Sequence, residues 1–183
     1  MLQDLITRAE LDAALEHVMA APKTDSAVQS LCRRPEFNKR QLVDRIQFTR
    51  AEGTPGERWS TLPWMRNEDG TPHPGIQVSI LGSRVVDLVW RNRDTVVHPG
   101  DPIVADLDTS EANLPVGTLI QAGTAVLRVS DVPNLGCVKW KVRYGVDALR
   151  WVESRPELRL RGVLCSVERD GEINMNDRLQ VLR

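Results

Sequence analysis

"GTLIQAGTAVLRVS", residues 117–130, places two short apolar runs on either side of a glycine. Each run has the length of a β-strand, at 117–121 and at 124–130. In the second run Leu127 and Val129 fall on one face, because successive side chains of a strand point to opposite sides. Short strands separated by glycine-rich turns are typical of a β-barrel or a β-sandwich. This stretch therefore indicates a mostly β fold.

Apolar runs of the same kind recur on both sides of this stretch. We predict strands at 76–81, 102–107, 117–121, 124–130, 137–141, 161–168 and 178–182. Residues 83–92 fit either a strand or a helix, and residues 144–152 fit a short helix. Residues 3–20 carry apolar side chains at helical spacing, and Pro22 ends that pattern. Residues 49–75 hold four Gly and four Pro, which predicts a long irregular loop.

The composition limits the class of protein. A chain of 183 residues is long enough for one domain, and 24 Lys and Arg against 25 Asp and Glu leave a net charge of −1. A near-neutral chain argues against broad binding to nucleic acid or to a membrane surface. The N-terminus is acidic from Asp4 onward, and no stretch reaches the roughly 18 apolar residues of a membrane span. We therefore expect a cytoplasmic protein with no signal peptide, no membrane span and no nucleic-acid partner.

Cysteine and histidine residues are few and widely spaced. They stand at Cys32, Cys137, Cys165, His17, His73 and His98. The spacing matches neither a disulfide framework nor a zinc site, and the GxSxG elbow of a serine hydrolase is missing. A catalytic pair of Cys137 with His73 or His98 stays open, because sequence spacing does not report such a contact.

Cys137 follows a Pro-Asn-Leu-Gly turn in "DVPNLGCVKWKVRYG", residues 131–145. On the predicted strand 137–141, Cys137, Lys139 and Lys141 would share one face, with Arg143 just beyond. Cationic neighbours stabilise a thiolate and lower the pKa of a cysteine, which makes it reactive. The alternative is a cysteine that only packs in the core, as free cysteines often do.

The segment "GTPGERW", residues 53–59, suggests an anion site in the long loop. Glycine lets backbone amides approach an anion, Arg58 offers a forked donor, and Trp59 presents a ring for stacking. The segment matches neither GxxxxGK[ST] nor GxGxxG, so it does not indicate nucleotide binding. The alternative is a Gly-Pro turn with an arginine on the surface.

Longer stretches resemble a known family, the molybdenum-cofactor sulfurase C-terminal (MOSC) domain. The resemblance lies in the order of "GD" before a strand, "LPVGT", "GTAVLRVS", one cysteine after a Pro-containing turn, and the ending "RGVLCSVERDGEINMNDRLQVLR". "GTPGERW" is similar to the GxxGDRW-like loop of that family, with Glu57 where Asp is common. The resemblance covers about residues 50–183. Asn134 and Leu135 depart from it, since many members have a polar Thr or His just before the Gly-Cys pair.

The resemblance implies a mostly β, MOSC-like β-barrel with a few peripheral helices and an N-terminal helix. Residues 1–48 would form a helical lead-in, and residues 49–183 the barrel domain. By motif position Cys137 would carry sulfur or ligate molybdenum, with a molybdopterin-type cofactor beside it. The residues expected to bind that cofactor are Lys139, Lys141, Arg143, Arg58, Gly56 and Trp59. Pyridoxal phosphate is not expected, because the chain has no room for the aminotransferase domain that is fused to MOSC in larger sulfurases.

Three hypotheses on function follow from the residues and the resemblance. In the first, the protein binds the pterin-type cofactor or receives sulfur from a donor protein through Cys137. In the second, it is a molybdenum-dependent oxidoreductase that reduces N-hydroxylated compounds with an electron-donor protein. In the third, it is a non-catalytic binding module in which Cys137 is buried. Whether the chain is an enzyme is left open.

Overall fold

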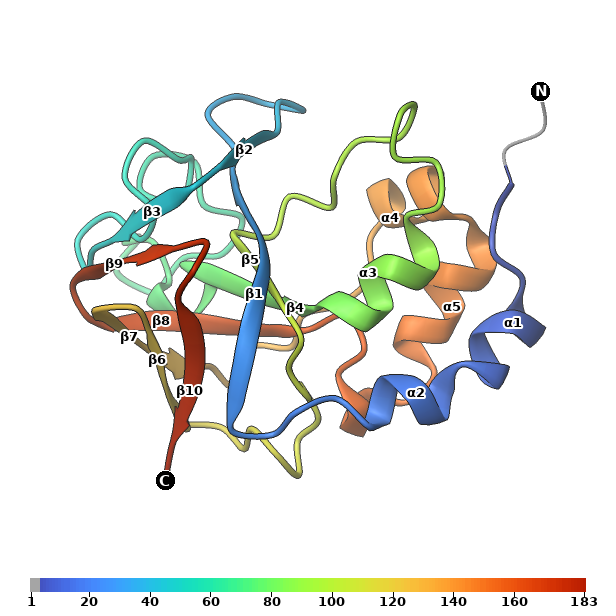
Figure 1. The fold of residues 1–183 in the computed structure, drawn as a ribbon. Coiled ribbons are helices and arrows are strands. Elements are labelled where there is room, and N and C mark those ends of the chain that lie inside the picture. Colours follow the sequence, from blue (N-terminus) through green and yellow to red (C-terminus); the bar gives the residue numbers. More distant parts are fainter. Residues whose placement is uncertain (1–3) are drawn as a thin grey trace.

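The computed structural model describes residues 4–183 and contains a closed barrel of seven strands. The barrel strands are β1 (Asp25–Arg33), β4 (Val78–Gly82), β5 (Ile103–Ala105), β6 (Leu119–Ala122), β7 (Ala125–Val129), β8 (Val163–Arg169) and β10 (Arg178–Leu182). They pair in the order β10-β6-β7-β8-β4-β5-β1, and β1 pairs with β10 to close the ring. β4 and β5 run parallel, whereas the other neighbours in the ring are antiparallel. Figure 1 shows the barrel beside a group of helices.

Three further short strands lie outside the ring of seven. β2 (Gln41–Val43) pairs with β1, and β3 (Arg45–Phe48) forms a separate ladder with β9 (Gly171–Asn174). Gly123 makes the tight turn between β6 and β7 at φ +62°, a conformation that L side chains rarely adopt. A Cβ there would also lie 2.2 Å from the Glu172 carbonyl oxygen, so β9 packs directly on this turn.

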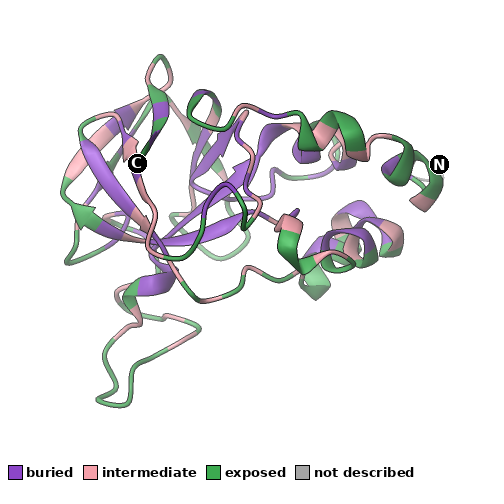
Figure 2. Cartoon of the chain, turned by 90° about the horizontal axis from the view of Figure 1, so that it is seen from below, coloured by how far each residue is buried: buried purple, intermediate pink, exposed green. Residues whose placement is uncertain are grey.

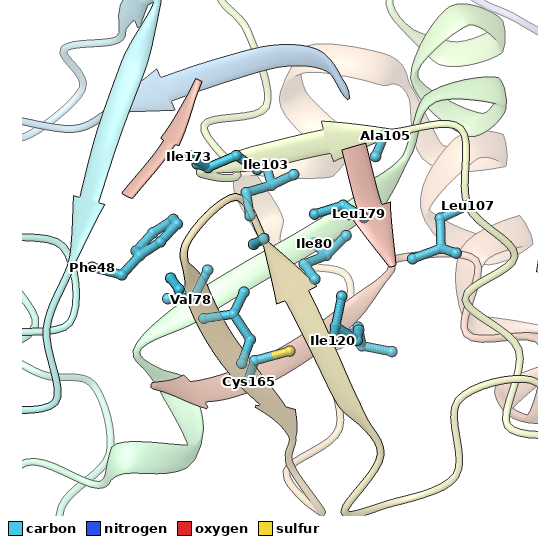
Figure 3. Packing of buried hydrophobic residues seen from close by; sticks show 14 of the residues in the cluster. Phe48, Val78, Ile80, Ile103, Ala105, Leu107, Ile120, Cys165, Ile173 and Leu179 are labelled. Atoms are coloured by element: carbon cyan, nitrogen blue, oxygen red, sulfur yellow. The ribbon is translucent and has the colours of Figure 1, made fainter. Parts of the chain in front are cut away.

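The barrel interior holds one hydrophobic cluster made by side chains that alternate inward along each strand. Among its members are Phe48, Ile80, Ile103, Ile120, Leu127, Cys165 and Leu179, all fully buried. Figure 3 shows Cys165 within this cluster, among side chains from several strands. Because its thiol packs with aliphatic groups, Cys165 is a core residue, as its apolar sequence context indicates.

The helices gather on one side of the barrel, as Figure 1 shows. They are α1 (Arg8–Ala13), α2 (Leu15–Met19), α3 (Ser83–Val89), α4 (Val138–Tyr144) and α5 (Val146–Glu153), with 3-10 turns η1 (Pro74–Ile76) and η2 (Pro156–Leu158). A second hydrophobic cluster fills the space between them and the outside of the barrel, and Leu11, Val86, Trp140 and Trp151 belong to it. Figure 2 shows buried residues on the barrel strands and on one side of the helices, with the exposed residues mainly in loops.

Most predicted strands are confirmed within a few residues, namely those at 76–81, 102–107, 117–121, 124–130, 161–168 and 178–182. The ambiguous segment 83–92 is helical in α3, and the predicted helix 144–152 corresponds to α5. The strand predicted at 137–141 is wrong, because this segment begins α4. The loop 49–75 is irregular up to η1.

The N-terminal region differs from the predicted helical lead-in over residues 1–48. Within the described part it is helical only in α1 and α2, and a capping box between Thr7 and Glu10 initiates α1. β1 then enters the barrel and supplies one of its seven strands. Residues 1–3 of the lead-in lie outside the described residues. Among residues 4–183, no helix has both the length and the apolar character needed to cross a membrane.

Candidate functional site

Cys137 stands at the N-cap position of α4, at the end of the loop that follows β7. Its side chain is exposed, and its thiol makes no capping hydrogen bond to the helix. The third hypothesis placed Cys137 in the core, and this part of it is wrong. Cys32 and Cys165 are instead buried, and burial raises the pKa of their thiols to about 11 and about 12.

The helical form of α4 changes the relation between Cys137 and the lysines. Trp140 and Tyr144 are one turn apart and pack edge to face, with ring centroids 4.8 Å apart, in the cluster between helices and barrel. An α-helix turns by about 100° per residue, so Lys139 and Lys141 point to opposite sides. Only Lys141 lies one helical turn after Cys137, and its backbone N–H donates to the Cys137 carbonyl at 3.1 Å. The expected strand face shared by these residues is therefore wrong.

Two contacts hold the loop that carries Cys137. The side-chain amide of Asn134 donates to the Arg161 carbonyl at 3.0 Å. Gly136 packs so closely on α5 that an added Cβ would lie 2.3 Å from Leu149 Cδ1 and 3.1 Å from Glu153 Oε1. Asn134 and Gly136 are thus held by the segment that leads into β8 and by α5, and the thiol of Cys137 stays at the surface.

Arg161 links this loop to the base of α4 and to a buried acid. Its guanidinium lies 4.7 Å above the Trp140 ring and forms an ion pair with Asp101, Nη1 to Oδ1, at 2.8 Å. Burial alone would raise the pKa of Asp101, but the charge and hydrogen bond of Arg161 outweigh it and hold that pKa below its usual value. Asp101 is therefore a buried carboxylate whose partner also supports the Cys137 loop.

The loop 53–59 meets α4 through Phe37, which lies between β1 and β2. Arg58 and Lys139 both approach the Phe37 ring, at 5.5 Å and 4.1 Å from its centroid. Two of the predicted binding residues are thus brought together by a residue that the sequence did not single out. Cation–π contacts of this kind hold exposed cations near an aromatic ring.

The other residues predicted in that loop have structural contacts. Trp59 is half-buried and donates its indole N–H to the His73 carbonyl at 2.9 Å, which ties two parts of the loop together. Gly56 lies against Arg33, which donates to the Pro55 carbonyl at 2.7 Å. Whether Gly56 and Trp59 also contact a cofactor stays a prediction.

Glu57 stands at the position where the similar GxxGDRW-like loop commonly has Asp. The contacts of its carboxylate show what an acidic side chain does at this position. It is buried and accepts from the backbone N–H of Arg34 at 2.7 Å and from its guanidinium at 3.0 Å. The pair joins the long loop to the end of β1. Glu57 therefore positions Arg34, the residue that follows β1.

Sequence reasoning missed Arg40, which is half-buried beside Arg143 and Arg34. Burial first, and then the charges of Arg143 and Arg34, lower the pKa of Arg40 from its usual value. Arg143 donates to the Pro99 carbonyl at 3.3 Å, and Arg40 packs against Gly100. Within residues 4–183 the Nε atom of Arg40 has no hydrogen-bond partner. Gathered cations of this kind suit an anion, and the only sequence signal was the basic run "CRRPEFNKR".

Neither histidine proposed as a partner of Cys137 makes a hydrogen bond to it. His98 is buried, accepts from the Gly100 N–H through Nδ1 at 3.0 Å, and lies 3.0 Å from Ser30 Oγ through Nε2. Burial lowers the pKa of His98 to about 4, so the ring is neutral near pH 7. His73 accepts from the Gly75 N–H through Nδ1 at 3.1 Å. Both rings hold local backbone in place.

One cavity borders the loop that carries Cys137, and a second lies elsewhere, among the helices. A cavity of about 350 Å³ borders the loop Ser130–Leu135 just before Cys137, and one of about 430 Å³ lies between α2, α3 and the segment 106–112. Among residues 4–183, no group of three or more His, Cys, Asp or Glu side chains is arranged to hold a metal ion. Cys137 therefore offers at most a single thiolate ligand.

Comparisons with known proteins support the fold. No family model and no curated protein matches the sequence. The crystal structure of the YuaD protein from Bacillus subtilis aligns with a TM-score of 0.64 at 16% identity, over 88% of this chain and 97% of that chain. YiiM from Escherichia coli aligns with a TM-score of 0.55 at 16% identity, over 85% and 69% of the two chains. YiiM from Geobacillus stearothermophilus gives 0.56 at 13% identity, over 86% and 75%. These likenesses support the mostly β, barrel-like fold expected from the sequence.

Proposed function

We propose that this MOSC-like protein carries sulfur as a persulfide on Cys137, in a site that also accepts an anionic pterin-type molybdenum cofactor. The observation that carries the proposal is the position of the thiol. Among the described residues, Cys137 is the one exposed cysteine, on a loop that Asn134 and Gly136 hold in place. A sulfur carrier needs a thiol that a donor can reach, and Cys32 and Cys165 are buried.

The transfer step balances without a further oxidant. The Cys137 thiolate attacks the outer sulfur of a donor persulfide, R–S–SH, and forms a new S–S bond. The S–S bond of the donor breaks, and the donor leaves as the thiolate R–S⁻ with the electron pair. The product is Cys137–S–SH, which keeps the proton of the transferred sulfur. An exposed thiol at the end of a held loop can meet a donor sulfur in this way.

The residues around Arg40 fit the anionic part of a pterin-type cofactor. Arg40 is half-buried and unpaired with a carboxylate within residues 4–183, its Nε is without a partner, and Arg143 and Arg34 lie nearby. A phosphate group would give Arg40 Nε a partner and relieve the repulsion between the cations. When bound, the cofactor would supply molybdenum redox chemistry. Arg40 and Arg143 would hold its anion, Arg58 and Lys139 would lie at the rim, and Cys137 would offer one thiolate.

The test is metal analysis and intact mass of protein purified under native, anaerobic conditions. We expect one added sulfur atom on wild-type protein, removed by a reducing thiol, and its loss in Cys137→Ser. Cys165→Ala is the matched control, since its thiol is buried and should carry none of the added sulfur. An added sulfur that persists in Cys137→Ser would overturn the proposal. Stoichiometric molybdenum with reductase activity on an N-hydroxylated compound, and no added sulfur, would establish the oxidoreductase hypothesis instead.

A further inference from the structure

An apolar stripe beside Cys137 runs from the loop before α4 along the outer side of the helix. Its members are Leu135, Val138 and Val142, which are 65%, 75% and 71% exposed. Val138 and Val142 are one helical turn apart, opposite the side on which Trp140 and Tyr144 are buried. The inner side of α4 explains why the helix forms, but nothing within the described chain covers the outer side. Exposed apolar side chains that gather in this way mark contact surfaces.

Cations flank the α4 stripe on both sides. Lys139 and Lys141 are exposed and point to opposite sides of the helix, with the stripe between them. The ion pairs found within residues 4–183 include neither lysine. α4 has no acidic residue, and the Asp147 carboxylate at the start of α5 accepts from the Arg8 backbone N–H. The surface is therefore apolar along its centre and positive along both edges.

The positive edge on the Lys139 side extends to the next loops. Lys139 lies over the exposed ring of Phe37, and Arg58 lies over the same ring from the loop 53–59. An apolar centre with a charged, solvent-exposed rim is the arrangement of protein–protein interfaces, and aromatic and arginine side chains are enriched there. Phe37 and Arg58 thus enlarge the surface beyond the helix.

We propose that the α4 stripe, with Lys139, Lys141, Phe37 and Arg58, is the docking surface for a protein partner whose own contact face is acidic. Charge complementarity decides the occupant. A second copy of the chain would place its own lysines opposite these lysines, and like charges across an interface oppose association. The surface does not depend on the chemistry at Cys137, but a partner seated on it would lie directly beside that thiol.

The size and composition of the surface also fit a transient protein contact. Three aliphatic side chains cannot cover the ~800 Å² per partner that a stable interface buries. Opposite charges give fast, salt-sensitive encounters with a small apolar contact at the centre. A membrane surface is disfavoured, because helices that lie in the interface have large apolar faces with Trp, Phe or Leu. α4 has seven residues and presents only Val138 and Val142 on its outer side, whereas Leu135 and Phe37 lie on loops.

The experiment is site-specific photo-crosslinking of the full chain in the cells that normally make it. A benzoylphenylalanine replaces Val138 or Val142, and matched positions Val116 and Leu182, also exposed but far along the chain from α4, are the controls. We expect a protein adduct at the two α4 positions, with a partner that mass spectrometry identifies as acidic. Lys139→Glu with Lys141→Glu should lower the adduct yield about tenfold, because charge steering is reversed.

Several results would overturn the proposal. These are no protein adduct at either α4 position, equal yields at Val116 and Leu182, a basic partner, or a yield that the charge reversal leaves unchanged. An adduct of twice the chain mass would assign the surface to self-association, and an adduct to lipid would assign it to a membrane. All the substituted side chains are exposed, so each variant should keep the thermal unfolding midpoint of the wild type. That midpoint is measured to show that each variant is folded.

Discussion

The ion pair between Asp101 and Arg161 is the most buried ion pair within residues 4–183, so among these pairs its loss should cost the most stability. The pair is nearly buried, with side-chain exposures of 1% and 14% and an Nη1–Oδ1 distance of 2.8 Å. Arg161→Met keeps much of the side-chain volume but leaves the Asp101 carboxylate charged and without its cation. Breaking a buried pair in this way costs about 3–5 kcal/mol. For a domain of this size the melting temperature should fall by roughly 10 °C.

A matched control separates burial from the mere presence of an ion pair. Arg128 and Glu168 approach to 2.9 Å but are 43% and 45% exposed. Arg128→Met should therefore leave the free energy of unfolding almost unchanged, because solvent screens an exposed pair. Adding Asp101→Asn to Arg161→Met should regain part of the lost stability, since no buried charge is then left alone.

The contribution of the Asp101–Arg161 pair to the free energy of unfolding should depend on pH. With Arg161 present the pKa of Asp101 lies below its usual value, so the pair stabilises the fold above about pH 4 and this contribution is lost as the pH falls further. In Arg161→Met burial is opposed only by the Ser79 hydrogen bond and the charge of Arg34, so the pKa of Asp101 rises and the deficit relative to wild type should shrink between pH 7 and pH 4. Urea unfolding of the wild type and of Arg161→Met at several pH values measures both free energies of unfolding. A deficit under about 1 kcal/mol at pH 7, or one that does not change with pH, would refute the reasoning.

Three further results are expected. At neutral pH a maleimide should label Cys137 within minutes in the folded protein, and mass spectrometry should find the other two thiols modified only after unfolding, since they are buried. Gly136→Ala should change the free energy of unfolding by no more than about 1 kcal/mol, because the new methyl would meet only the flexible ends of the Leu149 and Glu153 side chains; chemical denaturation measures this. His98 should titrate near pH 4 in an NMR experiment, and its protonation should favour the unfolded chain, so stability should fall between about pH 6.5 and pH 4.

The sequence predicted those strands whose local pattern and tertiary role agree. β6, β7 and β10 lie where the runs at 117–121, 124–130 and 178–182 predict them, because each buries one or both faces in the barrel. β1 was not predicted, since its segment DSAVQSLCR mixes acidic, polar and small residues. Its buried Ser26 contributes no hydrophobic signal, and its position is fixed by pairing with β5, β10 and β2.

The candidate site depended more heavily on contacts that are distant in sequence. The order of motifs located Cys137 and its loop, and the residue types predicted Arg58 and Lys139, which do meet at one aromatic ring. Arg40 was missed because its importance comes from the nearby Arg143, about a hundred residues away in the chain. A local sequence pattern does not report such a gathering of charges.

The misassigned strand at α4 also changes what the lysines are for. "VKWKVRY" alternates apolar and basic residues, so it fits a strand, but Trp140 and Tyr144 at helical spacing fit an amphipathic helix equally well. Packing of these two rings between the helices and the barrel decides in favour of the helix. On a strand Lys139 and Lys141 would both have turned toward the thiol, whereas on the helix they diverge around Val138 and Val142. Their charge is therefore arranged around the surface that a partner would meet, rather than around the sulfur atom that would react.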